Sequence, residues 1–390
     1  MTENEAASRL YISVSPMVKK ALDGFKISRA VRAGSWLFTN GQMDLGEGGK
    51  VLNPGDIIAQ TVTCMRSVYE VVAKANCRLA ELAQIQIFYL AGAVDDEAAY
   101  REWILQEFPE CRDVLFVLTP VPSFATVGSE VEIDAIAVKG RRDEATDTTG
   151  TVRGVRRGDW VFASNRAVKG GGSLCAALTE TLAQLGSGLS DVCRLYAYYP
   201  AHLSSAERAA IERELAVIFR DMPPVYHATL LPAGTERNFD VELEVIARVG
   251  SDEPKVRAGH VAPGTPGLDW PFAEVLRCAE IVFASGQFPL GTDNTVLHQG
   301  NIADQARTVM ARLEKALAQA GASMADLTKI KTYYVGAWDK ENWFDNLRAR
   351  MELLSDPGPA SSGIEGLPPV LEGALLSVDG IAVLDNTVNA

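Results

Sequence analysis

The sequence predicts an α+β protein built from three copies of one unit, and three observations support this prediction. Similar phrases occur three times along the chain: WLFTNGQMDL at residues 36–45, WVFASNRAV at residues 160–168 and IVFASGQFPL at residues 281–290. Each phrase is followed by the same succession of helical and strand patterns. The separation from Gly41 to Glu132 equals that from Gly286 to Ser377, whereas the middle copy is shorter.

In the first copy, an apolar strand pattern ends at Gly41 and Gln42. A helical pattern then begins at Asp56 in DIIAQTVTCMRSVYEVVAKA, where apolar residues recur three and four positions apart, as a helix with one buried face requires. A strand pattern follows at residues 81–90, a second helical pattern at 95–108 and a final strand, SEVEIDAIAV, at 129–138. The first copy therefore predicts a strand-rich α+β unit.

The other two copies repeat this order. The middle copy has helical patterns at residues 173–186 and 204–219 and strand patterns at 191–200 and 239–248. The third has helical patterns at 301–321 and 339–354 and strand patterns at 326–335 and 375–384. The register aligns Tyr89, Tyr199 and Tyr334, which we interpret as core or interface aromatics. Polar stretches at 140–150 and 250–255 predict linkers between units at 1–140, 151–250 and 256–390.

Composition limits the classes of function. The 47% hydrophobic and 22% charged residues are typical of a soluble globular protein, and the acidic, polar start with no long apolar run predicts a cytoplasmic protein without a membrane segment. The net charge of −13 argues against a nucleic-acid partner and makes an arginine in a pocket a candidate anion ligand. The six cysteines form no CxxC pair, so we expect buried free thiols. The four histidines lack metal-ligand spacing, so we expect no metal and no cofactor.

This succession of strand, SGQ-type loop, helix, strand, helix and VEIDAIAV strand resembles the Rid/YjgF family of imine and enamine deaminases. The resemblance is strongest in NGQMDL, GDIIAQT and VEIDAIAV of the first unit and in WPFAEVLRCAEIVFASGQFPL of the third. It implies three chorismate-mutase-like (YjgF-type) repeats that form a pseudo-trimer with a central sheet barrel, outer helices and ligand pockets between units. We therefore expect a monomeric pseudo-trimer and leave further self-association open.

The resemblance also implies catalytic residues. An arginine just before the penultimate strand binds the substrate carboxylate, and a glutamate on the last strand positions the attacking water. In unit 1 these positions fall on Arg112 and Glu132, although Asp113 follows where the family has Ser or Thr. The corresponding pairs in units 2 and 3 are Val225 with Glu242 and Ser361 with Ser377. Only unit 1 therefore keeps both groups.

Further ligand contacts are implied at the SGQ-type loops, on the last strand of unit 2 and at the position of a pocket tyrosine. These residues are Gly41, Gln42, Asn165, Arg166, Ser285, Gly286, Gln287, Glu242 and Phe272. The chemistry is consistent, because a carboxylate suits a bidentate guanidinium and hydrolysis of a C=N bond needs an acid–base group. The residues alone leave other interpretations open: a solvated pair for Arg112 and Asp113, a solvent-facing strand residue for Glu132, a surface charge for Arg166 and plain packing for Phe272.

We therefore expect a hydrolase that deaminates a small carboxylated imine or enamine at one surviving cleft. One alternative keeps the fold but acts on a larger metabolite, by chorismatase-like hydrolysis or another biosynthetic step; the long Gly- and Pro-rich stretch at residues 355–373 favours it. A second alternative is a non-catalytic small-molecule binding protein, which the loss of arginine in two units favours. The charge of −13 and the absence of paired histidines argue against an endoribonuclease.

Overall fold

The computed structural model describes residues 9–14, 24–140, 152–168, 174–233, 239–250, 255–260, 272–336 and 340–385. Unit 1 contains β1 (Leu10–Ile12), β2 (Ala30–Ala33), β3 (Trp36–Thr39), α2 (Ile57–Lys74), β4 (Leu82–Leu90), α3 (Glu97–Glu107), β5 (Leu115–Val121) and β6 (Val131–Val138). Unit 2 contains β7 (Val152–Arg157), β8 (Trp160–Ala167), α4 (Ala176–Gln184), β9 (Val192–Tyr199), α5 (Ser205–Ile218), β10 (Val225–Leu230) and β11 (Val241–Arg248). Unit 3 contains β12 (Val256–His260), β13 (Ala273–Cys278), β14 (Ile281–Gln287), α6 (Ile302–Gln319), β15 (Leu327–Tyr334), α7 (Lys340–Met351), β16 (Ala360–Glu365) and β17 (Leu376–Val383).

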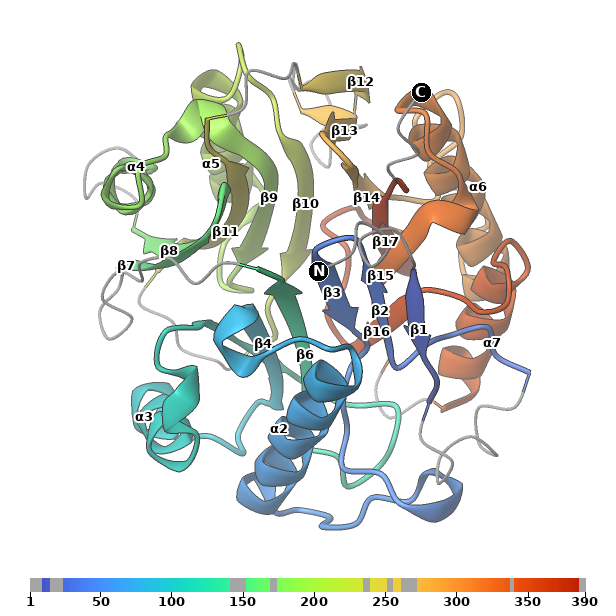
Figure 1. Ribbon diagram of the computed structural model, residues 1–390. Coiled ribbons are helices and arrows are strands. Elements are labelled where there is room, and N and C mark those ends of the chain that lie inside the picture. The colour runs from blue at the N-terminus through green and yellow to red at the C-terminus, as the bar shows by residue number, and fades with distance from the viewer. Residues whose placement is uncertain are drawn as a thin grey trace.

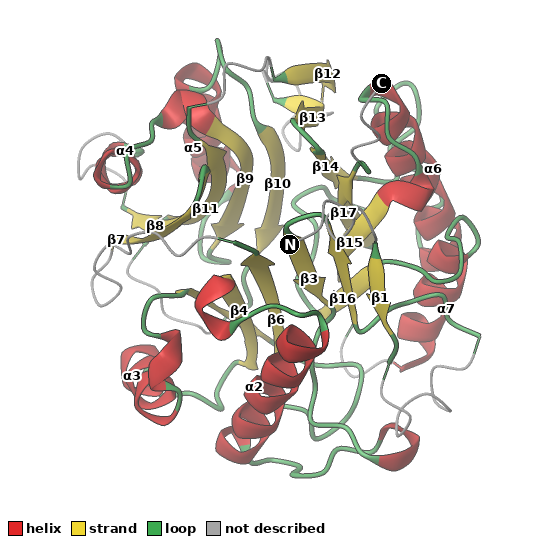
Figure 2. Ribbon diagram, viewed as in Figure 1, coloured by secondary structure: helices red, strands yellow, loops and turns green. Residues whose placement is uncertain are grey.

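Strand order is the same in the three units. It is β2-β3-β6-β4-β5 in unit 1, β7-β8-β11-β9-β10 in unit 2 and β13-β14-β17-β15-β16 in unit 3. In each unit the last strand pairs antiparallel with both neighbours, and the middle strand pairs parallel with the penultimate one. Helices lie on the outside of each unit and strands face the middle of the molecule (Figures 1 and 2). The predicted α+β fold of YjgF-type repeats is confirmed.

The units contact one another in a ring. Units 2 and 3 share one eleven-stranded sheet, because β10 pairs parallel with β13 at Val225 and Ala273. Unit 3 meets unit 1 through a parallel bridge between Ser28 and Ala360. Unit 1 meets unit 2 where the buried Arg157 guanidinium donates to the carbonyl of Leu82 at 3.0 and 2.8 Å. The loop that follows β3 of unit 1 lies beside residues of unit 3. The sequence does not specify which unit is the neighbour of this loop.

Each sheet packs against its own helices, and the strongest pattern is that of α2. The Asp56 side chain caps this helix by accepting a hydrogen bond from the Ala59 amide at 2.9 Å. The buried face of α2 carries Cys64, Met65, Val68, Val71 and Val72. The aromatics at the ends of the middle strands, Tyr89, Tyr199 and Tyr334, are buried in the three sheet–helix cores, as predicted.

A further core lies where the three units meet. It contains Trp36 and Phe38 of unit 1, Trp160 and Phe162 of unit 2 and Phe283 of unit 3. The Trp36 and Trp160 rings meet edge-on with centroids 4.8 Å apart. The inner faces of the strands therefore bury aromatic surface that a single unit would leave exposed to water.

Three findings bear on the predicted cysteines, membrane segments and linkers. All six cysteines are buried and free of disulfides. Of the helices in the described ranges, none is long and apolar enough to cross a membrane. The predicted linkers at 140–150 and 250–255 lie almost wholly outside the described residues.

Candidate functional site

A cavity of about 520 Å³ lies between units 1 and 3. Unit 1 contributes the loop that follows β3, an exposed side of α2 and the start of β6, and unit 3 contributes α7 and β16. Its lining includes Arg29, Asn40, Gly41, Gln42, Arg66, Ser67, Glu70, Lys74, Phe124, Glu132, Lys340, Trp343, Phe344, Arg350, Ser361 and Gly363. The cavity is large enough to enclose a small metabolite.

Backbone and side-chain hydrogen bonds hold the loop of unit 1 in place. The backbone of Gln42 exchanges two hydrogen bonds with Ile133, at 2.7 and 3.0 Å. The buried Gln42 side chain accepts hydrogen bonds from Arg29 at 2.9 Å and from Ser67 at 2.5 Å, and it donates to the Asn40 side chain. Gln42 therefore orients the loop, and Gly41 is left facing the cavity.

Glu132 has the environment expected of an acid–base group. Its side chain lies directly over Gly41, since a Cβ atom at Gly41 would be 1.6 Å from the Glu132 Oε1. Glu132 is 5% exposed and accepts no hydrogen bond from the part of the chain that the structure describes. Burial, and then the negative charge of Asp134, raise the pKa of Glu132 from 4.5 to about 8. At neutral pH the carboxyl is mostly protonated and faces the cavity.

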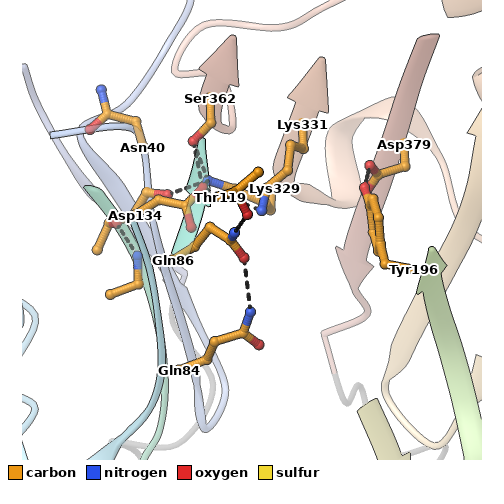
Figure 3. A network of polar contacts seen from close by, with 12 residues as sticks. Asn40, Gln84, Gln86, Thr119, Asp134, Tyr196, Lys329, Lys331, Ser362 and Asp379 are labelled. Atoms are coloured by element: carbon orange, nitrogen blue, oxygen red, sulfur yellow. Dashed lines mark hydrogen bonds and ion pairs between the residues drawn. The ribbon is translucent and has the colours of Figure 1, made fainter. Parts of the chain in front are cut away.

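A buried ion-pair network around Asp134, two residues along β6 from Glu132, joins the two units (Figure 3). The Lys329 ammonium donates to Asp134 at 2.9 Å, to Ser362 at 2.6 Å and to the Thr39 carbonyl at 2.6 Å. Burial alone would raise the pKa of Asp134, but Lys329 and Lys331 lower it to about 2. Asp134 is therefore ionised, and its charge adds to the effect of burial, which is the larger cause of the raised Glu132 pKa.

Arg350 supplies the buried cation of the cavity. It is 1% exposed, and its guanidinium donates to the Asn346 side chain at 3.2 and 3.0 Å and to the Ser361 hydroxyl at 3.4 Å. Among the residues described, no carboxylate forms an ion pair with Arg350. Burial lowers its pKa to about 10, so it stays charged at neutral pH. A buried cation without a counter-ion is costly, which favours an anionic ligand here.

Small side chains on β16 lie beside this arginine. A Cβ atom at Gly363 would lie 3.9 Å from the Arg350 Nη2, which is ordinary van der Waals contact. The strand register places Phe116 and Leu118 of β5 at the positions that Ser361 and Gly363 occupy on β16. The cavity is therefore open where unit 3 has small residues, and the equivalent surface of unit 1 is filled by large apolar ones.

Arg112 does not belong to this cavity. It is exposed at the turn after α3, and it lies three residues before the start of β5. The strand register shows why: Gln84 of β4, Arg194 of β9 and Lys329 of β15 pair with Leu115, Val225 and Ala360. The predicted equivalence of Arg112, Val225 and Ser361 is therefore out of register. A short 3₁₀ turn at Pro109–Cys111 moves Arg112 to the outer surface.

At the junction of units 2 and 3, His227 fills the space beside the SGQ loop. A Cβ atom at Gly286 would lie 2.3 Å from the His227 ring. His227 Nε2 lies 2.9 Å from the Ser377 hydroxyl, and its Nδ1 lies 3.0 Å from Asp379. This order of groups is like that of a serine-hydrolase triad. All three side chains are at most 2% exposed, however, and burial lowers the pKa of His227 to about 3. The hydrogen bonds therefore tie the two units together.

The other predicted residues of this junction are also buried. Ser285 and Gln287 are 1% exposed and hydrogen-bond each other, at 3.2 Å between the Gln287 amide and the Ser285 hydroxyl. Phe272 is fully buried in the core of unit 2, where it stacks on Tyr226 with centroids 4.5 Å apart. Phe272 therefore packs against the core and does not line the cavity between units 1 and 3.

At the junction of units 1 and 2, Arg166 forms ion pairs across the interface. It bonds to Glu97 of α3 and, at 3.1 Å, to Glu242 of β11, and it lies over the Phe239 ring. Asn165 is buried and donates to Thr181 at 3.2 Å. The two carboxylates raise the pKa of Arg166 despite its burial. This arginine is already paired with the protein's own acids.

Sequence reasoning thus identified Gly41, Gln42 and Glu132 of the cavity but missed Arg350. A signal for Arg350 exists in the sequence, because it shares the buried face of α7 with Leu347 and Met351. An arginine at a buried helix position needs a partner. In the described part of the chain, no cluster of His, Cys, Asp and Glu could hold a metal ion.

Comparison with known proteins finds one family that matches the first and third units. The family model described as endoribonuclease L-PSP matches residues 21–139 and 266–383, which correspond to units 1 and 3. Protein mmf1, mitochondrial, from Schizosaccharomyces pombe is 24% identical over 115 residues, covering 29% of this chain and 68% of that protein. The 3-aminoacrylate deaminase RutC of Acinetobacter baylyi is 37% identical over 65 residues, covering 17% of this chain and 52% of that enzyme. The match thus spans about half the length of RutC.

The solved structures extend the likeness beyond one unit. A chorismatase crystal structure superimposes with a TM-score of 0.56, covering 78% of this chain and 93% of that chain. The two sequences are 14% identical, so the likeness concerns the fold alone.

Proposed function

Because this chain belongs to the endoribonuclease L-PSP family, which includes the Rid/YjgF proteins, we propose that it hydrolyses a small carboxylated imine or enamine in the cavity between units 1 and 3. One observation carries the proposal: a buried Glu132 carboxyl, protonated at neutral pH and without a hydrogen-bond partner among the described residues, faces the same cavity as a buried arginine that no described carboxylate neutralises.

The roles follow from the two groups. Arg350 binds the substrate carboxylate through its guanidinium. The Glu132 carboxyl gives its proton to the imine nitrogen or, in an enamine, to the terminal carbon, and either transfer leaves an iminium ion. The Glu132 carboxylate then removes a proton from water as the water oxygen bonds to the iminium carbon. Collapse of the resulting carbinolamine, with the hydroxyl proton passed to nitrogen, releases ammonia and a 2-oxo acid.

The cavity volume favours a second candidate substrate. About 520 Å³ and the aromatic walls of Phe124, Trp343 and Phe344 exceed what a three-carbon imine needs. The same acid could protonate the terminal carbon of an enol ether on a larger, ring-bearing acid, after which water attack would release pyruvate and an alcohol. This reaction is hydrolysis of the chorismatase type, and it uses the same two residues.

The experiment measures ammonia and pyruvate release. The purified chain is added to 2-aminoacrylate generated in situ and, separately, to chorismate. We expect turnover of one substrate that falls at least a hundredfold in Glu132→Gln and in Arg350→Met, and that is unchanged in Arg112→Ala. Tryptophan fluorescence melts show whether each variant is folded. If folded Glu132→Gln retains the wild-type rate, or if no substrate is turned over faster than without protein, the proposal is wrong.

A further inference from the structure

The two walls of the cavity carry separate positive charges. Five cationic side chains line it, namely Arg29, Arg66, Lys74, Lys340 and Arg350, against two acidic ones, Glu70 and Glu132. The whole chain, by contrast, has a net charge of −13. The lining of this cavity is therefore more positive than the chain as a whole, and the contacts show which of the five cations are neutralised.

On the α2 wall, one acid neutralises two of the cations. Glu70 bonds to Arg29 at 2.7 Å and to Lys74 at 2.6 Å. These two partners lower the pKa of Glu70 to about 2. Arg66 lies on the same face of α2, one turn before Glu70, and makes no hydrogen bond or ion pair with the described residues. Its guanidinium therefore remains available to a ligand.

On the opposite wall, Arg350 also lacks an acidic partner within the described ranges, and Lys340 adds a second positive charge above the Phe344 ring. The same wall carries Trp343 and Phe344 of α7, and Phe124 of unit 1 also lines the cavity, so these three side chains offer it an apolar surface without charge. The cavity thus has an anion-binding group at each wall and aromatic side chains in its lining.

We propose that the ligand of this cavity is a dianion with an apolar, ring-sized body, whose first carboxylate binds Arg350 and whose second anionic group, a carboxylate or a phosphate, binds Arg66. The inference rests on the proposed site and adds the class of substrate. Arg66 is exposed, so a monoanion leaves its guanidinium to water and forgoes the second charge-assisted pair that a dianion forms. Arg66 is then the residue that selects dianions over monoanions.

The test is calorimetric titration with non-reacting probes: benzoate, the 1,2-, 1,3- and 1,4-benzenedicarboxylates and 4-phosphonobenzoate. We expect at least one dianion to bind about tenfold tighter than benzoate. Arg66→Met should remove this advantage and leave benzoate binding unchanged, whereas Arg350→Met should weaken both. Lys74→Met is the matched control, because Lys74 is already paired with Glu70. The comparison of phosphonate with dicarboxylates identifies the second group.

Equal binding of benzoate and every dianion would overturn the inference, and so would an equal effect of Arg66→Met on both classes or no binding by any probe. These outcomes are separate from the fate of the proposed reaction. A chain that binds dianions through Arg66 but turns over no substrate supports the inference and refutes the hydrolase. Turnover without a preference for dianions does the reverse.

Discussion

Replacing Glu132 by glutamine should stabilise the protein, and increasingly so as the pH rises. Glutamine has the shape of the protonated carboxyl but cannot ionise. The folded chain raises the pKa of Glu132 from 4.5 to about 8. The proton therefore contributes stability that is complete below pH 4.5 and is lost as the pH rises to 8. Each pH unit between the two pKa values, where the unfolded chain ionises Glu132 and the folded chain does not, costs the wild type about 1.36 kcal/mol. The stability advantage of E132Q should therefore grow from about 1 kcal/mol at pH 5 to about 5 kcal/mol at pH 9.

The assay is denaturant unfolding of wild type and E132Q between pH 5 and 9, followed by tryptophan fluorescence. Taking the difference between the two proteins at each pH removes the contributions of the other titrating groups. Glu242→Gln is the matched control, since Glu242 holds the same position in unit 2 but pairs with Arg166 at 3.1 Å. It should destabilise the protein. A difference between E132Q and wild type that does not change with pH would refute the reasoning.

Three further results are expected. Above about pH 8 the kcat/KM of the wild type should fall as Glu132 ionises. Asp134→Asn should move this fall to a pH roughly one unit lower, because it removes a negative charge that raises the Glu132 pKa. A pH profile of kcat/KM that is the same in both proteins would contradict this. Gly41→Ala should abolish turnover in a folded protein, because the new methyl group would lie 1.6 Å from Oε1; retained activity would show that Glu132 need not lie there. Arg166→Met should destabilise the chain by about 3 kcal/mol, because it leaves the buried Glu242 without its ion-pair partner. The double variant Arg166→Met/Glu242→Gln should recover most of the lost stability. Denaturant unfolding of the two variants measures both effects.

The fold was predictable because its determinants are local and repeated. Helix periodicity, the acidic or amide cap before α2 and α6, and the aromatic strand ends each recur in sequence. The identity of neighbouring units was not predictable. It depends on contacts such as the Ser28 bridge to Ala360, which join residues more than three hundred positions apart.

Site residues could be predicted from the sequence only where the backbone allows a single residue type, as at Gly41. Gly41 is required because Glu132 lies over it, and this pair stands out in both the motif and the structure. Arg112 shows the opposite case. The turn before the penultimate strand differs between units, so counting residues along the chain cannot fix the register of that strand. The strand pairing shows that Leu115, and not Arg112, is the unit 1 equivalent of Val225. Arg350 reaches the cavity from a helix, where a strand motif gives no information.

The three junctions differ because one chain, unlike three identical chains, can change each of them separately. His227 and Arg166 fill two junctions with groups whose hydrogen bonds and ion pairs are satisfied internally. Among the described residues, the third junction keeps Glu132 without a hydrogen-bond partner and Arg350 without a carboxylate partner. These two groups come from different units, so their separation depends on how firmly the other junctions are held. We infer that the filled junctions stabilise the ring, and that this stability allows an acid and a cation to remain apart and unpaired in the open one.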